Sequence, residues 1–425
     1  MAVIDKVLGA QHGPVAKLRL GRDHGPSMPL LGDGWSYPEP GFTWTLGNQS
    51  RLRLPTTFGA NGRLVLELSL HGFCAPGTCA GQRLTVMVNG TELGNATVAQ
   101  TATLGFLIPE RIAASGVLDI ALLHPDAVSP AACGISGDTR LLALAVSAVR
   151  LWRLPPGACS GMDVLPPLPM EPDAVPPALR GMAPAALAEQ FVSLGQNCEF
   201  GLMQRMVGAE PLGLLRFAGI DLPDLLRGLD TGFAGVENPE HFEFKSGMFQ
   251  DRMEYLVFAK RHGIRLHTHI FLDETKDIDA VALRVTGYLG FLRRHFVHTL
   301  QAGERMFVLQ HPAVKTMNDA LPVLARLCAY GNNRLLYVTE ESRIPAGTVR
   351  REAAGLYQGA IDGFVPPDEA WRINVPAWLS LCANVWQAEH GARNVPTVAW
   401  ASPSANPVWP AQSLPDTGLR PAAEP

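Results

Sequence analysis

Charge is scarce in this sequence, and neither sign dominates. Only 17% of the 425 residues are charged, and 39 acidic against 35 basic side chains give a formal net charge of −4. A chain with this balance has no general attraction for phosphate backbones or anionic lipid. We therefore expect no nucleic-acid partner.

Long hydrophobic runs are also missing. The longest strongly apolar run, 141–149, is far shorter than the roughly 20 residues that cross a bilayer. The sequence therefore predicts no transmembrane segment. The opening residues, MAVIDKVLGAQHG, have a single lysine, no long apolar stretch and no small-residue cleavage site. This is not the pattern of a secretory signal, and we expect a cytoplasmic location.

Cysteine is too sparse for a disulfide framework. There are seven cysteines, an odd number in a long chain, which indicates mostly free thiols. Cys74, Cys79 and Cys133 lie in one region, but no adjacent histidine or second close cysteine pair completes four zinc ligands. We expect loop thiols or a local disulfide there, no metal site and no cofactor.

Residues 1–154 carry the pattern of a β-sandwich. Short β segments separated by turn residues run from Trp35 to about Leu154. In 64–71, leucines alternate with largely polar residues, which is the period of a strand with one buried face. Asn-Gly at 89–90 lies between two apolar segments and predicts a hairpin turn. The predicted first domain is an antiparallel β-sandwich resembling carbohydrate-binding domains.

Proline-rich segments follow the two predicted domains. Residues 155–187 contain so many prolines, which lack a backbone donor, that we expect a linker there. From 401 to 425, proline and small residues dominate and no hydrophobic period survives, so we expect a disordered tail. A second domain then occupies 188–400.

This second domain alternates strand and helix patterns. The predicted strands cover 191–195, 305–310 and 334–339, and the predicted helices cover 198–208, 281–300 and 317–330. Repeated strand, helix, strand order implies right-handed crossovers. We therefore predict an α/β domain with a mainly parallel sheet and helices on both faces.

Candidate functional residues follow the ends of these strands, where ligands gather in an open parallel sheet. Gln196, Asn197 and Cys198 follow the first strand, His311 the second and Glu340 the third. At the first turn of a helix, backbone donors and the helix dipole would lower the pKa of Cys198. The preceding turn could supply donors to an oxyanion. Cys198 is the predicted nucleophile, and the alternative is a cysteine that only packs.

Three histidines are candidates for the base. His267 and His269 are two residues apart in the predicted strand 265–271 and share one of its faces. They lack a third ligand, so the pair does not predict a metal site. We expect His267 or His269 to accept the thiol proton, with His311 as the competing base.

Substrate contacts are predicted in both domains. Arg205 and Arg216 could pair with a carboxylate or phosphate group, and Glu340 would lie at the same sheet edge. Trp35, Tyr37 and Trp44 lie close together in a Pro/Gly-rich stretch. Aromatic faces stack on sugar rings, although tryptophans also close sandwich cores.

The run SLGQNCEFGLMQRMVGAEPLGLLRFAGI at 193–220 resembles a bacterial family described as papain-like cysteine peptidases, marked by Ser-Leu-Gly-x-x-Cys. The likeness continues to about residue 340. It implies that Cys198 is the nucleophile and His267 the family histidine, while Thr268 stands where the family often has aspartate. A true papain fold lacks the predicted crossovers, and we prefer the α/β fold.

Two further resemblances concern context. The N-terminal part, including GWSYPEPGFTWTLG, is similar to β-sandwich domains attached to bacterial glycosyltransferases and exopolysaccharide proteins. The Asn-Cys turn is also similar to that of Cys–His capsule acyltransferases, and acyl hydrolysis and acyl transfer share this machinery.

These patterns predict a cysteine-dependent acyl hydrolase or acyltransferase of bacterial exopolysaccharide metabolism, acting on a glycan or a glycan-linked small molecule. One alternative is a glycosyltransferase-like enzyme, in which the arginines would hold the phosphate of a nucleotide sugar. Another is a non-catalytic carbohydrate-binding protein that uses the aromatic stretch of the first domain.

Overall fold

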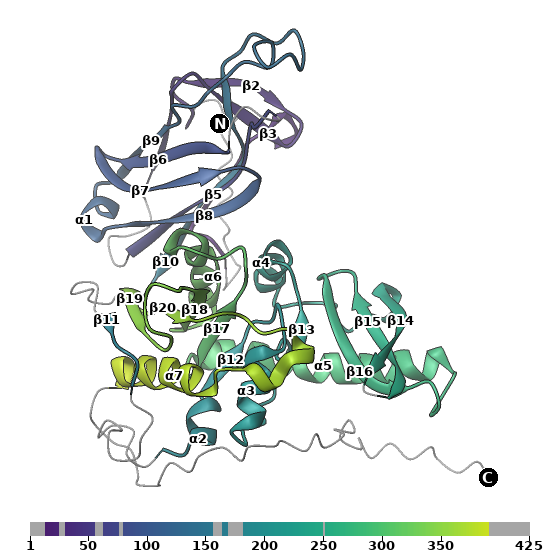
Figure 1. Ribbon diagram of the computed structural model, residues 1–425. Helices are drawn as coiled ribbons and strands as arrows, with labels where there is room; N and C mark the ends of the chain where they lie inside the picture. The colour runs from purple at the N-terminus through teal and green to yellow at the C-terminus, as the bar shows by residue number, and fades with distance from the viewer. Residues whose placement is uncertain are drawn as a thin grey trace.

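The computed structural model describes residues 13–24, 30–55, 63–75, 80–155, 164–168, 182–249 and 251–390. Figure 1 shows a β-sandwich above a second body of mixed helices and strands, with a small lobe at its side. The protein is therefore sheet-rich and multidomain, with several antiparallel sheets. The predicted tail, 401–425, lies outside the described residues. Cys79 also lies outside them, so the prediction of loop thiols or a local disulfide there is not tested.

The sandwich consists of two antiparallel sheets. Its strands are β1 (Ala16–Arg19), β2 (Trp35–Glu39), β3 (Phe42–Leu46), β4 (Gln49–Pro55), β5 (Arg63–Gly72), β6 (Gln82–Val88), β7 (Thr91–Val98), β8 (Thr101–Ile108), β9 (Val117–Leu123) and β10 (Leu142–Leu154). The first sheet has the order β2-β3-β10-β5-β8, with β1 paired to β10, and the second has the order β4-β9-β6-β7. Helix α1 (Glu110–Ala113) and a short 3-10 helix (Arg22–His24) complete this part.

The predicted hairpin at 89–90 is confirmed. Asn89 and Gly90 connect β6 to β7, and both have positive φ, 49° and 77°. These angles suit a two-residue turn whose twist matches that of the flanking strands.

The first sheet is buried on both faces, which the alternation in 64–71 did not predict. The leucines of β5 face the second sheet, whereas Val65 and Glu67 are also fully buried. Helix α6 (Met317–Tyr330) covers this face of the sheet. It packs closely on Gly105 of β8, the residue paired with Glu67, because a Cβ added at Gly105 would lie only 2.6 Å from Cβ of Leu321. The two domains therefore share a packed interface.

A buried charge network crosses this interface. Glu67 of β5 pairs with Arg326 of α6 at 2.5 Å and with Arg150 of β10 at 2.6 Å. Arg326 also contacts Asp230 at 2.8 Å and lies over the ring of Trp152. Charges this deeply buried require partners, so the network fixes how the domains dock.

The second body is built on a six-stranded mixed sheet of order β11-β19-β20-β18-β17-β12. Its strands are β11 (Val164–Leu165), β12 (Phe191–Ser193), β17 (Met306–Gln310), β18 (Arg334–Glu340), β19 (Val349–Ala353) and β20 (Leu356–Ile361). The pairs β12–β17, β17–β18 and β18–β20 are parallel, and the two pairs of β19 are antiparallel. Strand β11 lies within the predicted linker.

Helices pack on both faces of this sheet. They are α2 (Pro184–Ala188), α3 (Glu199–Met206), α4 (Leu222–Thr231), α5 (Ile278–Ala302), α6 and α7 (Val375–His390), with 3-10 turns at Pro239–His241 and Pro367–Arg372. Phe307 and Leu309 of β17 join the core with α5 and α6, while Met306 and Val308 join the core with α3 and α7. This alternation follows from strand geometry.

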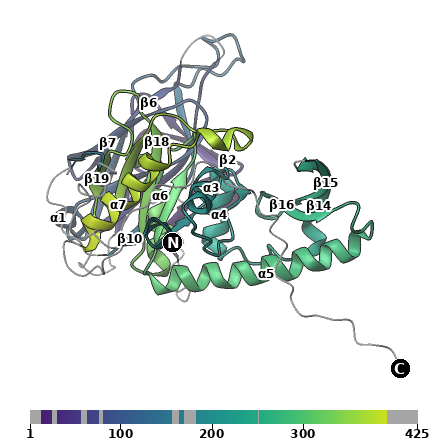
Figure 2. The same cartoon turned by 60° about the horizontal axis from the view of Figure 1, so that its bottom comes forward.

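A separate antiparallel sheet forms the lobe. It contains β13 (Ala218–Gly219), β14 (Phe242–Phe249), β15 (Arg252–Ala259) and β16 (Ile264–Phe271), in the order β13-β16-β15-β14. Figure 2 shows the long helix α5 running from this lobe back to the main body. The sequence predicted only β16 of this sheet. The lobe matters because β13 and β16 carry one wall of the candidate site.

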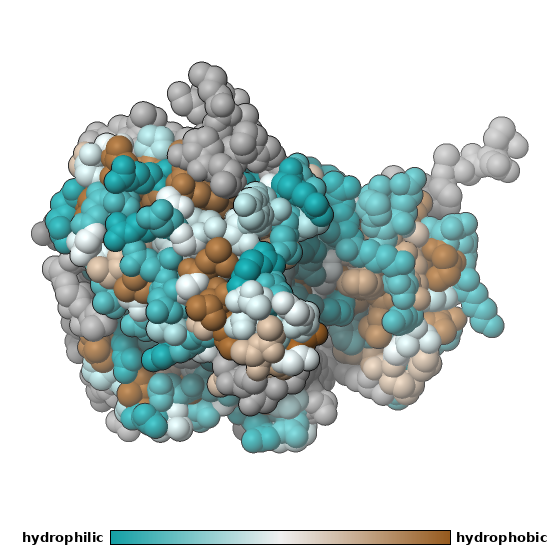
Figure 3. Space-filling model, turned by 90° about the horizontal axis from the view of Figure 1, so that it is seen from above, coloured by the Kyte–Doolittle hydropathy of each residue, from teal (hydrophilic) through white to brown (hydrophobic). Residues whose placement is uncertain are grey.

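The molecular surface is mixed in polarity. Figure 3 shows hydrophilic and hydrophobic residues interleaved over the main body and the lobe on the face seen from above. Among the described residues, no helix combines the length and the apolar character needed to cross a bilayer.

Candidate functional site

The turn before Cys198 has an unusual backbone. After β12, Gly195 and Gln196 both have positive φ, 85° and 84°. Positive φ is uncommon outside glycine and costs free energy at Gln196. Asn197 then accepts a hydrogen bond from the backbone N of Glu199 at 3.0 Å, across Cys198, which is the N-cap residue of α3. Cys198 is thereby held at the helix N-terminus.

The thiol of Cys198 is not activated in the resting protein. It is half-buried, and burial raises its pKa to about 11, against a smaller opposing effect of Arg205. The expected lowering of this pKa is therefore wrong, because loss of solvent around the thiol raises it. At neutral pH the sulfur keeps its proton.

Cys198 lines a cavity of about 590 Å³, which we call the thiol cavity. Gln196 and Asn197 line it from the same turn, and His267 lines it from the lobe. The other lining residues are Phe217, Gly219, Glu243, Lys245, Leu256, Val257, Phe258, Arg265 and Leu266. The groups of a thiol site thus come from elements far apart in the sequence, although no hydrogen bond links Cys198 to His267 within the described residues.

His267 is held by a carboxylate. Its Nδ1 contacts Oε1 of Glu254, a fully buried residue of β15, and Oε2 of Glu254 accepts from the backbone N of His269 at 3.1 Å. A carboxylate on Nδ1 fixes the ring and leaves Nε2 as the nitrogen available for proton transfer. Glu254 thus holds the ring of His267, and it is not among the residues that the sequence predicts for the site. Its signal in the sequence is a single charged residue inside the otherwise largely apolar pattern of 253–259.

Thr268 is not a substitute for that acid. Its side chain is buried, and Oγ1 donates to the backbone O of Tyr255 at 2.6 Å. The register between β15 and β16 shifts here, and His269 has a φ of 51°. The rings of His267 and His269 lie at 6.2 Å, nearly parallel, and burial lowers the pKa of His269. Among the described residues, no three metal-ligating side chains form a group suited to a metal ion.

The other predicted strand-end residues do not join Cys198. His311 is buried, and its Nδ1 accepts from the backbone N of Ala313 at 3.0 Å. Burial lowers the pKa of His311, partly opposed by Asp221, so the ring is neutral. Glu340 is exposed and accepts from the backbone N of Phe364 at 2.8 Å. Neither residue lines the thiol cavity, and the imidazole that lines it together with Cys198 is that of His267 from the lobe.

Both arginines that the sequence predicts as substrate contacts form hydrogen bonds or ion pairs with other residues of the protein. Arg216 is buried and donates to Gln204, Glu210 and three backbone oxygens, at 2.6–3.2 Å. Burial lowers its pKa, although Glu210 opposes this. Arg205 also pairs with Glu210, at 2.8 Å, and both guanidinium groups lie 4.7 Å from the ring centre of Phe217. Arg216 is therefore a structural anchor, contrary to the prediction.

The aromatic stretch of the sandwich is not a single flat platform. Trp35 packs against the sandwich core and donates to the backbone O of Arg51 at 2.6 Å. Trp44 makes edge-on contacts with Phe42 and Phe73, and Tyr37 is 84% exposed. The three predicted sugar-stacking residues thus have three different environments.

Comparisons with known proteins give distant structural likenesses. No family profile and no curated protein matches the chain, so the resemblance of 193–220 to cysteine peptidases finds no support there. The C-terminal CBM6 of LamC from Zobellia galactanivorans is 16% identical over 32% of this chain and 98% of that chain, with a TM-score of 0.19.

Two other solved structures are similarly distant. A carbohydrate-binding module, CBM36 in complex with calcium and xylotriose, is 13% identical over 32% of this chain and 98% of that chain, with a TM-score of 0.20. The acetyl xylan esterase Est2A from the rumen bacterium Butyrivibrio proteoclasticus is 8% identical over 89% of this chain and 99% of that chain, with a TM-score of 0.21. Scores this low establish neither a shared fold nor a shared activity, and the chain is assigned to no family.

Proposed function

We propose that the protein is a cysteine-dependent acyl hydrolase or acyltransferase. Cys198 is the nucleophile, His267 the general base and Glu254 the residue that positions His267. The observation that carries this proposal is that the thiol and the carboxylate-paired imidazole line the same cavity. We take the second body as an α/β domain that presents Cys198 beyond the end of its parallel strand β12.

The reaction begins with a protonated thiol, since the pKa of Cys198 is raised. Nε2 of His267 takes the proton as Sγ attacks the acyl carbonyl carbon, and the carbonyl electron pair moves to oxygen. The tetrahedral intermediate collapses, and the leaving oxygen departs with the proton from His267. Water or an acceptor hydroxyl then gives its proton to His267 and attacks the thioester. Sulfur leaves and regains the proton.

We propose that the turn at 196–197 stabilises the developing oxyanion. Gln196 and Asn197 line the thiol cavity beside Cys198, and both are half-buried. The side-chain oxygen of Asn197 accepts from Glu199, so its amide nitrogen is oriented away from that bond. Donors fixed before the reaction stabilise charge that forms on the carbonyl oxygen. The positive φ of Gln196 is consistent with a backbone held for this task.

We further propose a glycan as the partner in acyl transfer or hydrolysis. The support is the resemblance of the N-terminal part to sandwich domains of exopolysaccharide proteins. The thiol cavity also carries hydroxyl-compatible polar groups, because Glu243, Lys245 and Arg265 line it. A sugar could bind there as leaving group or acceptor while its acyl group reaches Cys198.

The test is hydrolysis of p-nitrophenyl acetate and of O-acetylated oligosaccharides. Cys198→Ala should lower kcat/KM by roughly 10³-fold or more, as loss of a nucleophile does. Cys133→Ala removes a free thiol of the sandwich and should leave the rate unchanged. Equal rates for wild type and Cys198→Ala, or the absence of turnover in the wild type, would contradict the proposal. Glycan retention by an inactive wild type would instead favour the carbohydrate-binding alternative.

A further inference from the structure

A second cavity, of about 260 Å³, lies next to the thiol cavity, and we call it the acyl cavity. Phe217, Leu266 and His267 line both cavities. The proposed base therefore lies where the two spaces meet, and a substrate carbonyl at Cys198 would place one of its two substituents toward each cavity. The two cavities differ in size and in the side chains that line them.

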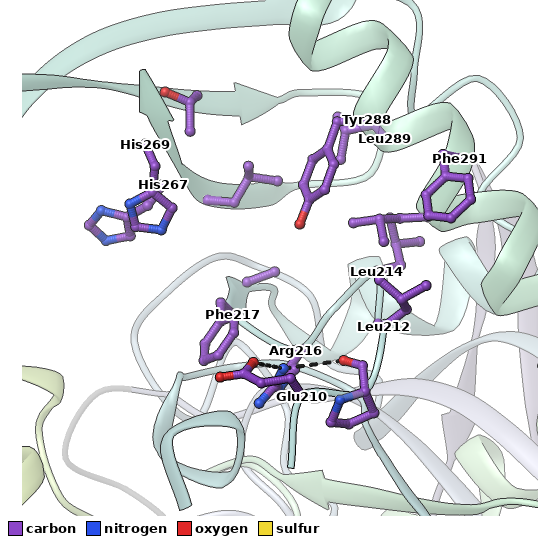
Figure 4. A pocket seen from close by; sticks show the side chains of 16 residues that line it. Glu210, Leu212, Leu214, Arg216, Phe217, His267, His269, Tyr288, Leu289 and Phe291 are labelled. Carbon is purple, nitrogen blue, oxygen red and sulfur yellow. Dashed lines mark hydrogen bonds and ion pairs between the residues drawn. The ribbon is translucent and has the colours of Figure 1, made fainter. Parts of the chain in front are cut away.

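The walls of the acyl cavity are mainly apolar. Leu214, Leu289 and Leu292 line it and are almost completely buried, with exposures of 3%, 0% and 3%. Figure 4 shows Phe291 and Leu212 closing the same side, while His267 and His269 lie at the opposite end. Apolar surface of this kind is favourable for hydrocarbon and not for a sugar ring.

The polar groups of the acyl cavity do not form a site for a charged ligand. Glu210 accepts from Arg216, and the guanidinium of Arg216 already donates to five protein oxygens. In Figure 4 the hydroxyl of Tyr288 points into the space. Burial raises the pKa of Tyr288, so this hydroxyl is neutral. An uncharged occupant is therefore favoured.

The thiol cavity differs in size and in charge. It is more than twice as large, and Glu243, Lys245 and the largely exposed Arg265 line it. A large leaving group or acceptor fits this larger cavity, whose Lys245 and Arg265 reach solvent, better than the smaller one between buried leucines. The direction in which a substrate binds follows from this contrast.

We propose that the acyl cavity binds the hydrocarbon part of the acyl group, so that the substrates are esters of acyl groups longer than acetyl. This inference rests on the proposed function. The carbonyl carbon would lie beside Cys198 and His267, the chain would extend past Phe217 between the buried leucines, and the alcohol part would remain in the thiol cavity.

The experiment compares kcat/KM for p-nitrophenyl acetate, butyrate, hexanoate and octanoate. In the wild type the value should rise by about fourfold per methylene until the cavity is full, the factor that corresponds to burial of one methylene. Phe291→Ala enlarges the cavity and should move the optimum to longer chains, whereas Phe291→Trp should move it to shorter ones. Phe291 is 47% exposed, so both variants should fold. Leu283→Ala, on the same helix but 73% exposed and outside both cavities, is the matched control.

Binding of unreactive amides separates this inference from the proposed function. Hexanamide should bind to Cys198→Ala more tightly than acetamide in ligand-observed NMR, and Phe291→Trp should weaken it. A flat chain-length profile that still depends on Cys198 would overturn the acyl cavity while sustaining the thiol mechanism. Length-dependent amide binding without any ester turnover would sustain the cavity and overturn the mechanism. Equal binding of both amides would overturn the cavity in either case.

Discussion

At the scale of single residues, the site combines an unactivated thiol with a positioned imidazole. Burial raises the pKa of Cys198 to about 11, while Glu254 holds His267 through Nδ1. The base must therefore act during attack, because no thiolate waits in the resting protein. This differs from a cysteine site in which a stable ion pair forms before substrate binds.

The raised pKa predicts slow alkylation of Cys198 at neutral pH. The folded protein favours the protonated thiol, so the thiolate fraction should still be increasing almost tenfold per pH unit at pH 9 and reach one half only near pH 11. The measurement is the rate of iodoacetamide labelling of the Cys198 peptide, by mass spectrometry, from pH 7 to 10.5. The same peptide from protein unfolded in urea provides the reference. A plateau below pH 8 in the folded protein would refute this description of the thiol.

Glu254 should act as a positioning residue. Glu254→Gln keeps the shape but loses the negative charge beside His267, so kcat should fall by on the order of 10²–10⁴-fold with a smaller change in KM. Steady-state assays across pH 5–9 give both kcat and KM. Glu254→Asp should recover part of kcat and the shape of the pH profile. If Glu254→Gln changes only thermal stability and not kcat, Glu254 has a structural role alone.

At the scale of secondary structure, the sequence predicted strands and helices better than their partners. The leucine alternation of β5 and the Asn89-Gly90 turn are local signals, and both features are present. Strands β14 and β15 were missed because their polar and apolar residues do not alternate cleanly on a half-exposed sheet. The same reason applies to Glu254, since its importance depends on the pairing of β15 with β16, which the sequence does not predict.

The interface between β8 and α6 depends on a glycine. A Cβ at Gly105 would lie 2.6 Å from Leu321 and 3.0 Å from Pro322, so Gly105→Ala should destabilise the protein by about 1–3 kcal/mol through overpacking. Urea unfolding followed by circular dichroism measures this difference. Gly137→Ala is the control, because no atom lies within 4 Å of its added Cβ. Equal midpoints for the two variants would show that α6 does not pack tightly against β8.

At the scale of the whole molecule, the sandwich and the second body form one packed unit. Proline content at 155–187 predicts a linker, but it carries no information about how the two domains dock. The interface depends on residues such as Glu67 and Arg326, which are 259 positions apart. Sequence period could not reveal this pairing, because a charged residue on a strand normally indicates an exposed face.

Acid should weaken this interface. Burial alone would raise the pKa of Glu67, but Arg326 and Arg150 outweigh it and hold that pKa below its ordinary value. A lowered folded-state pKa contributes stability that is present above the unfolded value and is lost as pH falls through the folded value. Glu67→Gln should therefore cost about 3–5 kcal/mol at pH 7, because the buried Arg326 and the half-buried Arg150 both lose a charged partner. When the pH falls from 7 to below 4, the unfolding free energy of Glu67→Gln should decrease by less than that of the wild type.

Thermal and urea unfolding at pH 7 and pH 3.5 test this expectation. Glu243→Gln is a suitable control, because Glu243 lies in the lobe and pairs with exposed lysines. Identical stability of Glu67→Gln and the wild type at pH 7 would mean that the buried network does not hold the domains together.

The central claim is that Cys198 becomes acylated with help from His267. The most direct measurement is peptide mass spectrometry after rapid acid quench of the protein mixed with p-nitrophenyl butyrate. We predict a butyryl group on the Cys198 peptide within the first turnover, and a much slower appearance of this thioester in His267→Ala. Turnover with no label on Cys198, or labelling at an unchanged rate in His267→Ala, would contradict it.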